Sequence, residues 1–340
     1  MRHLATAGML AALLVPAARA ESAAPTCGTG DNLMSWPNVN PVWQFCWRRA
    51  QDSTGPNGSG LEIHDVYYKG KLVLKRAHCP ILNVLYDAGG CGCYRDWSDQ
   101  EVVFQSDNEI FPGYSEPTSP PLTVCDTGGS AGDQGTFFGV AAEKSPDLIM
   151  TTQYEAGWYR YTMKWIFKLD GTIQTYFGFA AVSASCVNYS HVHHVYWRLD
   201  FDIDGAANDM VSEGAKSKKP VRIMKEDKRM RADAPGMYWI VRDMMTNRGY
   251  KITPGPDDQY ADPFGVADAW ILAYHAGAEI DDTGQSGPPC AIKFTNFLNN
   301  ESVYGADVVF WYGGHAEKHM GGDLDVCHVI GPTLTPVGNW

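Results

Sequence analysis

The amino-acid sequence predicts an all-β protein, a large antiparallel β-sandwich. Apolar and polar residues alternate in many short segments, as in strands whose side chains point to opposite faces of a sheet. Turns rich in glycine and proline separate these segments, and the 340-residue chain contains 35 glycines and 20 prolines. No stretch beyond residue 20 keeps the 3.6-residue periodicity of a long helix. Many short strands without long helices favour two packed sheets.

The first twenty residues are predicted to be a secretory signal. Arg2 precedes an apolar run over residues 4–18, and Ala-Arg-Ala stands directly before Glu21. This is the order of a signal peptide and its cleavage site. The apolar run is too short to anchor the chain in a membrane. We therefore expect cleavage near Ala20 and export of a soluble protein to the periplasm or the medium.

Charge and cysteine content narrow the partners and the compartment. Without the signal, 25 basic residues stand against 39 acidic ones, a net charge near −14. Such an acidic surface argues against nucleic-acid or anionic-membrane partners and is compatible with small cationic substrates. Nine cysteines in an oxidising compartment predict disulfides and at least one remaining thiol.

The chain after the signal divides into two parts. Residues 21–58 are rich in Pro, Gly, Asn and Ser and are expected to form an irregular lead-in, and residues 59–340 the sandwich. Residues 206–235 carry many lysines and arginines with little apolar periodicity, which favours an exposed loop or short hairpin. Strands are expected within residues 61–68, 71–75, 77–86, 148–153, 159–167, 172–185, 190–205, 237–242, 249–253, 269–275 and 306–311.

The segment 190–205 is the most informative of these strands. His191 and His193 are two residues apart, so their imidazoles share one face of a strand, and His194 faces the other way. Two imidazoles on one face are suited to a metal ion. The alternative is a polar strand face whose histidines have no ligand.

Aspartates near the end of the same strand repeat this spacing. Asp200, Asp202 and Asp204 lie at successive second positions. Carboxylates are the oxygen ligands that hard cations prefer. The alternative is an acidic strand edge without an ion.

Several motifs together resemble the catalytic β-sandwich domain of the copper amine oxidases. They occur in the family's order and extend over about residues 60–340. We expect this chain to lack the family's smaller N-terminal domains. The resemblance implies the same fold and a copper-dependent oxidation of primary amines by O2 to aldehydes. The motifs are Gly60–Val66, His191–Gly205, Tyr250–Gly255, Ala306–Trp311 and Leu334–Gly338.

The resemblance implies a copper site with three histidine ligands. His191 and His193 match the first two. We expect His315 as the third, because it directly continues the strand of the Asp-Val-Val-Phe-Trp motif. His319 and His328 are the alternatives. Three imidazoles with open positions suit Cu(II) and can also hold zinc.

The family's organic cofactor, topaquinone, is made from one of its own tyrosines. The motif Tyr-x-Tyr followed by Trp places Tyr159 at that position. Trp158 and Arg160 stand where the family has Asn and an acidic residue. Tyr154 is the alternative precursor, and a third possibility is that Tyr159 is an ordinary packed aromatic residue.

The resemblance also implies a general base and a partner for the quinone. Asp87 is expected to remove the substrate's α-proton, although the loop that follows it is shorter than in the family. Asp87 can equally be a turn residue. Tyr86 is expected to hydrogen bond the quinone oxygen.

Further features follow from the resemblance. Asp200, Asp202 and Asp307 match the family's peripheral calcium positions, and Cys93 and Cys125 match its disulfide. Family members form dimers, so a homodimer is compatible with this chain.

A second class of function fits the same ligands. The altered surroundings of Tyr159 and the shortened loop at Asp87 are compatible with a copper-binding sandwich without amine oxidase turnover. Such a protein would handle metal, bind a partner or run a different copper reaction.

Overall fold

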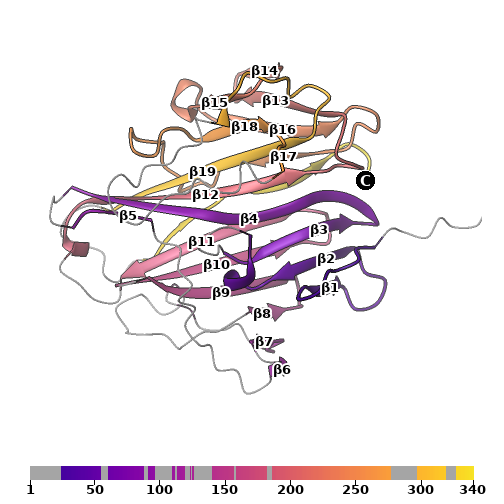
Figure 1. The fold of residues 1–340 in the computed structure, drawn as a ribbon, viewed down its shortest axis with the longest axis horizontal. Helices are drawn as coiled ribbons and strands as arrows, with labels where there is room; N and C mark the ends of the chain where they lie inside the picture. The colour runs from indigo at the N-terminus through magenta and orange to yellow at the C-terminus, as the bar shows by residue number, and fades with distance from the viewer. Residues whose placement is uncertain are drawn as a thin grey trace, which may run out of the picture.

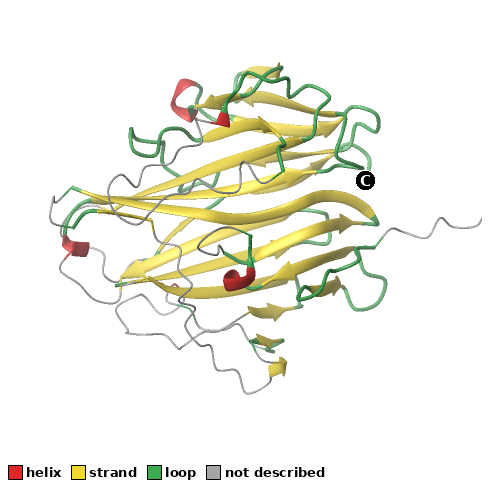
Figure 2. Cartoon of the chain, viewed as in Figure 1, coloured by secondary structure: helices red, strands yellow, loops and turns green. Residues whose placement is uncertain are grey.

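The expectation of an all-β fold is confirmed. The computed structural model describes residues 24–54, 60–87, 91–95, 109–111, 113–118, 123, 125, 140–156, 158–181, 186–276, 297–318 and 327–340. Strands dominate this part of the chain (Figure 2). The helical elements η1 (Ala50–Asp52), η2 (Cys186–Asn188) and η3 (Arg231–Asp233) are single 3₁₀ turns.

The first sheet contains the histidine strand at its centre (Figure 1). Its strands run antiparallel, and β5 (Cys93–Arg95) pairs with β4 at one side. In spatial order they are β1 (Asn32–Trp36), β2 (Trp43–Arg48), β3 (Glu62–Tyr68), β4 (Lys71–Tyr86), β12 (His191–Phe201), β19 (Val308–Lys318), β18 (Ala269–Ala273) and β15 (Asp227–Arg229).

The second sheet contains the strand of Tyr159. It is antiparallel except for the parallel pair β7–β8, and β20 (His328–Ile330) pairs with β11. In spatial order its strands are β14 (Lys218–Ile223), β13 (Asp209–Ala215), β16 (Tyr238–Asp243), β17 (Gly249–Thr253), β21 (Thr333–Val337), β11 (Ile173–Ala181), β10 (Tyr159–Phe167), β9 (Leu148–Ala156), β8 (Val140–Glu143), β7 (Tyr114–Ser115) and β6 (Glu109–Phe111).

An aromatic core joins the two sheets. Phe167 of β10 lies 4.6 Å from Phe45 and 5.1 Å from Trp43 of β2, measured between ring centroids. Trp239 of β16 lies 5.3 Å from Phe310 of β19. All five side chains are fully buried. The sheets therefore pack face to face, which makes the molecule the expected sandwich.

The structure corrects the expected irregular lead-in. Within residues 21–58, strands β1 and β2 form an antiparallel hairpin, and β2 pairs with β3. Alternate residues of β2 bury Trp43, Phe45 and Trp47 in the core. Because these aromatic side chains need the opposite sheet to cover them, the segment joins the sandwich instead of resting on it.

The lysine-rich segment is a hairpin, as expected for part of residues 206–235. Strands β13 and β14 pair with each other, and β14 is exposed over Lys218–Arg222. The other strand, β13, also pairs with β16. The hairpin is thus the solvated edge of the second sheet.

Side chains of β12 alternate between two different environments. On one face, Val195, Trp197 and Leu199 belong to the core between the sheets. On the other face, Tyr196 belongs to a smaller apolar cluster, with Trp270 of β18. The core between the sheets covers one face of β12 and the smaller cluster covers the other, while β4 and β19 pair with its two edges.

The disulfides differ from the expected pairing. Cys125 is bonded to Cys327, so the expected Cys93–Cys125 bridge is wrong. The physical reason is that β20 pairs with β11 and brings Cys327 beside Cys125, whose Sγ lies over Gly178. Cys93 is also disulfide bonded, and Cys79 is a buried free thiol, as expected for one cysteine. The other described bridges are Cys27–Cys46 and Cys91–Cys186.

The predicted signal, residues 1–20, lies outside the described residues. In the described ranges, the structure contains no helix with the length and apolar character needed to cross a membrane.

The packing of β10 on β2 predicts a large stability loss for Phe167→Ala. Removing this buried ring is expected to lower the free energy of unfolding by about 3–5 kcal/mol, because a cavity replaces two ring contacts. Urea denaturation followed by tryptophan fluorescence measures the change. Val221→Ala on the exposed strand β14 is the control, with an expected change within about 0.5 kcal/mol. A loss below about 1 kcal/mol for Phe167→Ala would contradict the described packing.

Candidate active site

A histidine and a tyrosine from opposite sheets meet at one end of the sandwich. The hydroxyl oxygen of Tyr159, the first residue of β10, lies 2.5 Å from Nε2 of His191, the first residue of β12. Both side chains are at most 1% exposed. The structure therefore brings together the predicted quinone precursor and the first predicted copper ligand.

A backbone carbonyl sets the tautomer of His191. Its Nδ1 lies 2.7 Å from the carbonyl oxygen of Tyr189 and donates a proton to it. The lone pair of the neutral ring is then on Nε2 and faces Tyr159, whose O–H donates to it. Metal-binding histidines commonly use their second nitrogen in this way.

The second histidine is enclosed by aromatic rings. His193 lies on the same face of β12, with its ring centroid 5.3 Å from that of His191. The hydroxyl of Tyr161 is 3.4 Å from Nε2 of His193, and the Phe179 ring is 4.0 Å from the imidazole. The Tyr159 and Tyr161 rings are nearly parallel. These rings exclude water from the imidazole pair.

Tyr86 belongs to the same cluster. It is the last residue of β4, opposite His191 in the register, and its ring stacks on that imidazole at 4.5 Å. Trp158 donates its indole N–H to the Tyr86 hydroxyl at 2.9 Å. Trp158 stands where the resembling family has Asn, and its contact with Tyr86 was not expected from the sequence. Its neighbour Arg160 is buried and donates to the carbonyl oxygen of Tyr159.

Asp87 lies at the exposed end of this cluster. Its side chain is exposed, and its backbone N–H donates to the carbonyl oxygen of Ser190 at 2.9 Å. The hydrogen bond holds Asp87 next to the start of β12. Among the described contacts, none joins its carboxylate to Tyr159. For the alternative precursor Tyr154, the register pairs it with Tyr161.

His315 lies on the opposite face of the sheet from His191 and His193. It pairs directly with His194 in the β12–β19 register, and the two Nδ1 atoms are 2.8 Å apart. The expectation that His315 completes the His191–His193 site is therefore corrected. The physical reason is the alternation of side chains along a strand. Ala316 stands opposite His193 and shares its face, so the preceding residue, His315, points to the other face. Burial lowers the pKa of His194 to about 4 and that of His315 well below the ordinary value.

Of the two alternative histidines, the structure describes the surroundings of His328 alone. His328 on β20 stacks on Phe179 at 5.2 Å, and Phe179 in turn contacts His193. His319 lies outside the described residues. It follows Lys318, the residue paired with His191.

The three predicted calcium ligands do meet. Each of Asp200, Asp202 and Asp307 places a carboxylate oxygen within 4.8 Å of the others. Burial and the neighbouring Asp200 raise the pKa of Asp202 to about 7. Burial, and then Asp202 and Asp307, raise the pKa of Asp209 to about 10. Burial and the neighbouring carboxylates disfavour the charged form of these side chains, and a bound cation would favour it.

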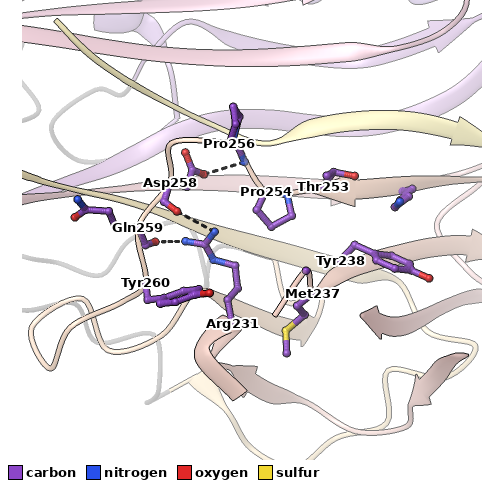
Figure 3. Close-up of a pocket in the computed structure, with 12 residues that line it drawn as sticks. Arg231, Met237, Tyr238, Thr253, Pro254, Pro256, Asp258, Gln259 and Tyr260 are labelled. Atoms are coloured by element: carbon purple, nitrogen blue, oxygen red, sulfur yellow. Dashed lines mark hydrogen bonds between the residues drawn. The ribbon is translucent and has the colours of Figure 1, made fainter. Parts of the chain in front are cut away.

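A separate cavity of about 520 Å³ lies away from the histidine–tyrosine cluster, with which it shares no lining residue (Figure 3). Tyr238, Lys251 and Tyr260 line it. Arg231 reaches it from η3, but its guanidinium is already bonded to Asp268 and to the carbonyl oxygens of residues 258 and 259. The cavity therefore offers little unpaired charge from Arg231.

The fold matches solved amine oxidases. A lysyl oxidase from Pichia pastoris has a TM-score of 0.61 at 15% identity, over 87% of this chain and 51% of its own. A copper-containing benzylamine oxidase from Hansenula polymorpha has 0.62 at 14%, over 95% and 64%. An amine oxidase from Aspergillus nidulans has 0.59 at 14%, over 97% and 55%. No protein-family model and no curated protein matches the sequence.

The chain has the fold of the copper amine oxidases. The resemblance that its motifs predicted is confirmed at this level, because identities of 14–15% establish shared architecture. The chain spans 51–64% of the length of these three enzymes.

The crowded carboxylates predict that a divalent cation stabilises the protein. Adding Ca²⁺ to chelator-treated protein is expected to raise its thermal unfolding temperature, because the ion relieves repulsion among Asp200, Asp202 and Asp307. At a hundred times the Kd the gain is about 2.7 kcal/mol. Differential scanning fluorimetry measures the shift. Asp307→Asn is expected to remove most of it and the exposed Asp233→Asn none; equal shifts in both variants would contradict this site.

Proposed function

We propose that this chain is an exported copper protein of the amine oxidase type, in which Tyr159 is the precursor of a quinone that oxidises primary amines with O2. One observation carries the proposal. The Tyr159 hydroxyl lies 2.5 Å from Nε2 of His191, the ring nitrogen that carries the lone pair. An imidazole of the kind that binds copper and an oxidisable phenol therefore occupy one buried site.

The residues present fit a copper ion. His191 and His193 offer two neutral imidazoles on one strand face, and imidazole is a preferred ligand of Cu(II). The Tyr189 carbonyl orients His191 as a second-sphere partner does in metal sites. We propose His319 as the third ligand, because the alternation that turns His315 away from His191 is described only as far as Lys318 and so does not exclude His319.

The chain's own residues position the reacting groups. When bound, copper together with the quinone supplies the oxidation of the amine and the transfer of electrons to O2. The Tyr86 ring stacks on His191, and its hydroxyl accepts a hydrogen bond from the Trp158 indole. Phe179 and Tyr161 exclude water around His193. Asp87, at the exposed end, is the proposed acceptor of the substrate's α-proton.

A second candidate keeps the copper and omits the turnover. Two observations favour it, namely the exposed carboxylate of Asp87 and the replacement of the family's Asn and acid by Trp158 and Arg160. A general base must reach the proton that it removes. Under this reading the site binds copper and does not oxidise amines.

The setting of the protein is proposed from its composition and bridges. Disulfides persist in oxidising compartments, which supports export after cleavage near Ala20. The acidic surface favours a small cationic amine as substrate and disfavours nucleic acid and anionic membranes. A homodimer and a calcium ion at Asp200, Asp202 and Asp307 complete the proposal.

Peptide mass spectrometry tests the quinone directly. After copper and air are added to metal-free protein, the peptide with Tyr159 is expected to gain mass, because ring oxidation adds oxygen. His191→Ala is expected to leave that peptide unmodified. An unmodified Tyr159 in copper-loaded wild-type protein would reject the oxidase reading and favour the second candidate.

The proposed base has its own control. Asp87→Asn is expected to retain the modified Tyr159 peptide but to lower amine oxidation by at least about 100-fold, since general base catalysis contributes about 10²–10⁴. Peroxide release with a panel of primary amines measures the rate. Full activity in Asp87→Asn would assign the base to another residue.

The third ligand is identified by comparing single alanine variants. His319→Ala is expected to abolish quinone formation, whereas His315→Ala is expected to retain it, because His315 faces away from His191. A redox-cycling stain of the denatured protein detects the quinone. His328→Ala is the matched comparison on the side of Phe179. Loss of the quinone in His315→Ala with retention in His319→Ala would contradict the assignment.

A further inference from the structure

A second pair of histidines lies on the outward face of the first sheet. His194 and His315 stand directly opposite each other on β12 and β19, and both are fully buried. Their Nδ1 atoms are 2.8 Å apart. Because side chains alternate along β12, this pair is on the other side of the sheet from His191 and His193.

Each of these imidazoles has a carboxylate beyond its outer nitrogen. Nε2 of His194 is 3.6 Å from Asp262, and Nε2 of His315 is 3.7 Å from Asp268. Neither Nε2 makes a hydrogen bond of ordinary geometry to the described residues. Asp268 is fully buried and paired with Arg231 at 2.9 Å, whereas the Asp262 side chain is 33% exposed. The order is carboxylate, imidazole, imidazole, carboxylate.

The distance between the two rings fits two arrangements. Either one ring donates its Nδ1–H to Nδ1 of the other, or both Nδ1 lone pairs bind one cation. A metal ion accepts both lone pairs while each Nε2–H faces its carboxylate, as in carboxylate–histidine–metal sites.

Two glycines keep side-chain atoms away from the pair. A Cβ on Gly265 would lie 2.6 Å from Nδ1 of His194 and 3.1 Å from Cε1 of His315. A Cβ on Gly313 would lie 3.0 Å from Nε2 of His315. Neither glycine has a positive φ, so space and not backbone conformation requires glycine at these positions.

We propose that His194 and His315 form a second metal site for a divalent transition metal, with Cu(II) preferred. With metal–nitrogen bonds of about 2.0 Å, a nitrogen separation of 2.8 Å corresponds to an angle of about 90°, the cis arrangement of tetragonal Cu(II). Tetrahedral zinc would require about 3.3 Å. Asp262, partly exposed, marks the side from which the ion and its water ligands enter. The site does not depend on amine oxidation or on Tyr159.

Copper stoichiometry of the full chain tests this site. Protein loaded with Cu(II) and desalted is expected to hold two copper ions per chain by elemental mass spectrometry. His191→Ala and His194→Gln are each expected to hold one, and the double variant none. If His194→Gln holds as many copper ions per chain as the wild type, the proposal is overturned, and the contact between His194 and His315 is a hydrogen bond between the two rings. If His194→Gln loses a copper ion and His191→Ala does not, the site at His194 and His315 stands and the proposed copper site at His191 and His193 is rejected.

A second pair of variants removes no ligand, and so stays informative if His194→Gln fails to fold. Asp262→Asn is expected to weaken copper binding at this site by about 10–100-fold in chelator competition, as removal of such a partner does. Asp257→Asn, an exposed change in the same loop, is the control and is expected to bind as the wild type. Gly265→Ala is expected to lose the ion, because its Cβ would occupy the edge of Nδ1. Wild-type affinity in both Asp262→Asn and Gly265→Ala would contradict the site.

Discussion

The two-residue alternation of β12 is the constraint on which the rest of the structure depends. β4 and β19 flank β12 on either side, so every side chain must enter either the space between the sheets or the smaller outward cluster. His191 and His193 enter the first, where Tyr159 meets them from the opposite sheet. Tyr196 enters the second, and His194 lies on the same face beside His315. A shift of one residue in register would exchange these environments completely.

Burial gives this arrangement its chemical character. Water would supply hydrogen bonds to the imidazoles, the phenol and the carboxylates alike, whereas the interior allows each group only the partners that the fold supplies. His191 has the Tyr189 carbonyl on one nitrogen and the Tyr159 phenol on the other. Asp202 lies beside other carboxylates, and its pKa rises to about 7. Burial therefore determines the hydrogen-bond partners of His191 and also the raised pKa of Asp202.

The sequence predicted the sandwich, the pairing of His191 with His193 and the approach of Tyr159, because each follows from local alternation or from a motif of contiguous residues. It also predicted that Asp200 and Asp202 meet Asp307. It did not predict the position of His315. Continuation of a strand is visible in sequence, but the face that a residue takes depends on the register with β12. The Cys125–Cys327 bridge and the contact of Trp158 with Tyr86 depend on the same long-range placement.

Two disulfides constrain the backbone on either side of the histidine cluster. Cys91–Cys186 ties the corner after β4 to the turn that precedes His191, and Cys125–Cys327 ends one residue before His328. Covalent closure of these long loops removes conformations from the unfolded chain. The bridges therefore restrict the backbone around the imidazoles with or without an ion. A chain kept in a reducing cytosol would meet copper with these turns untied, and thiols would then compete with histidines for the metal.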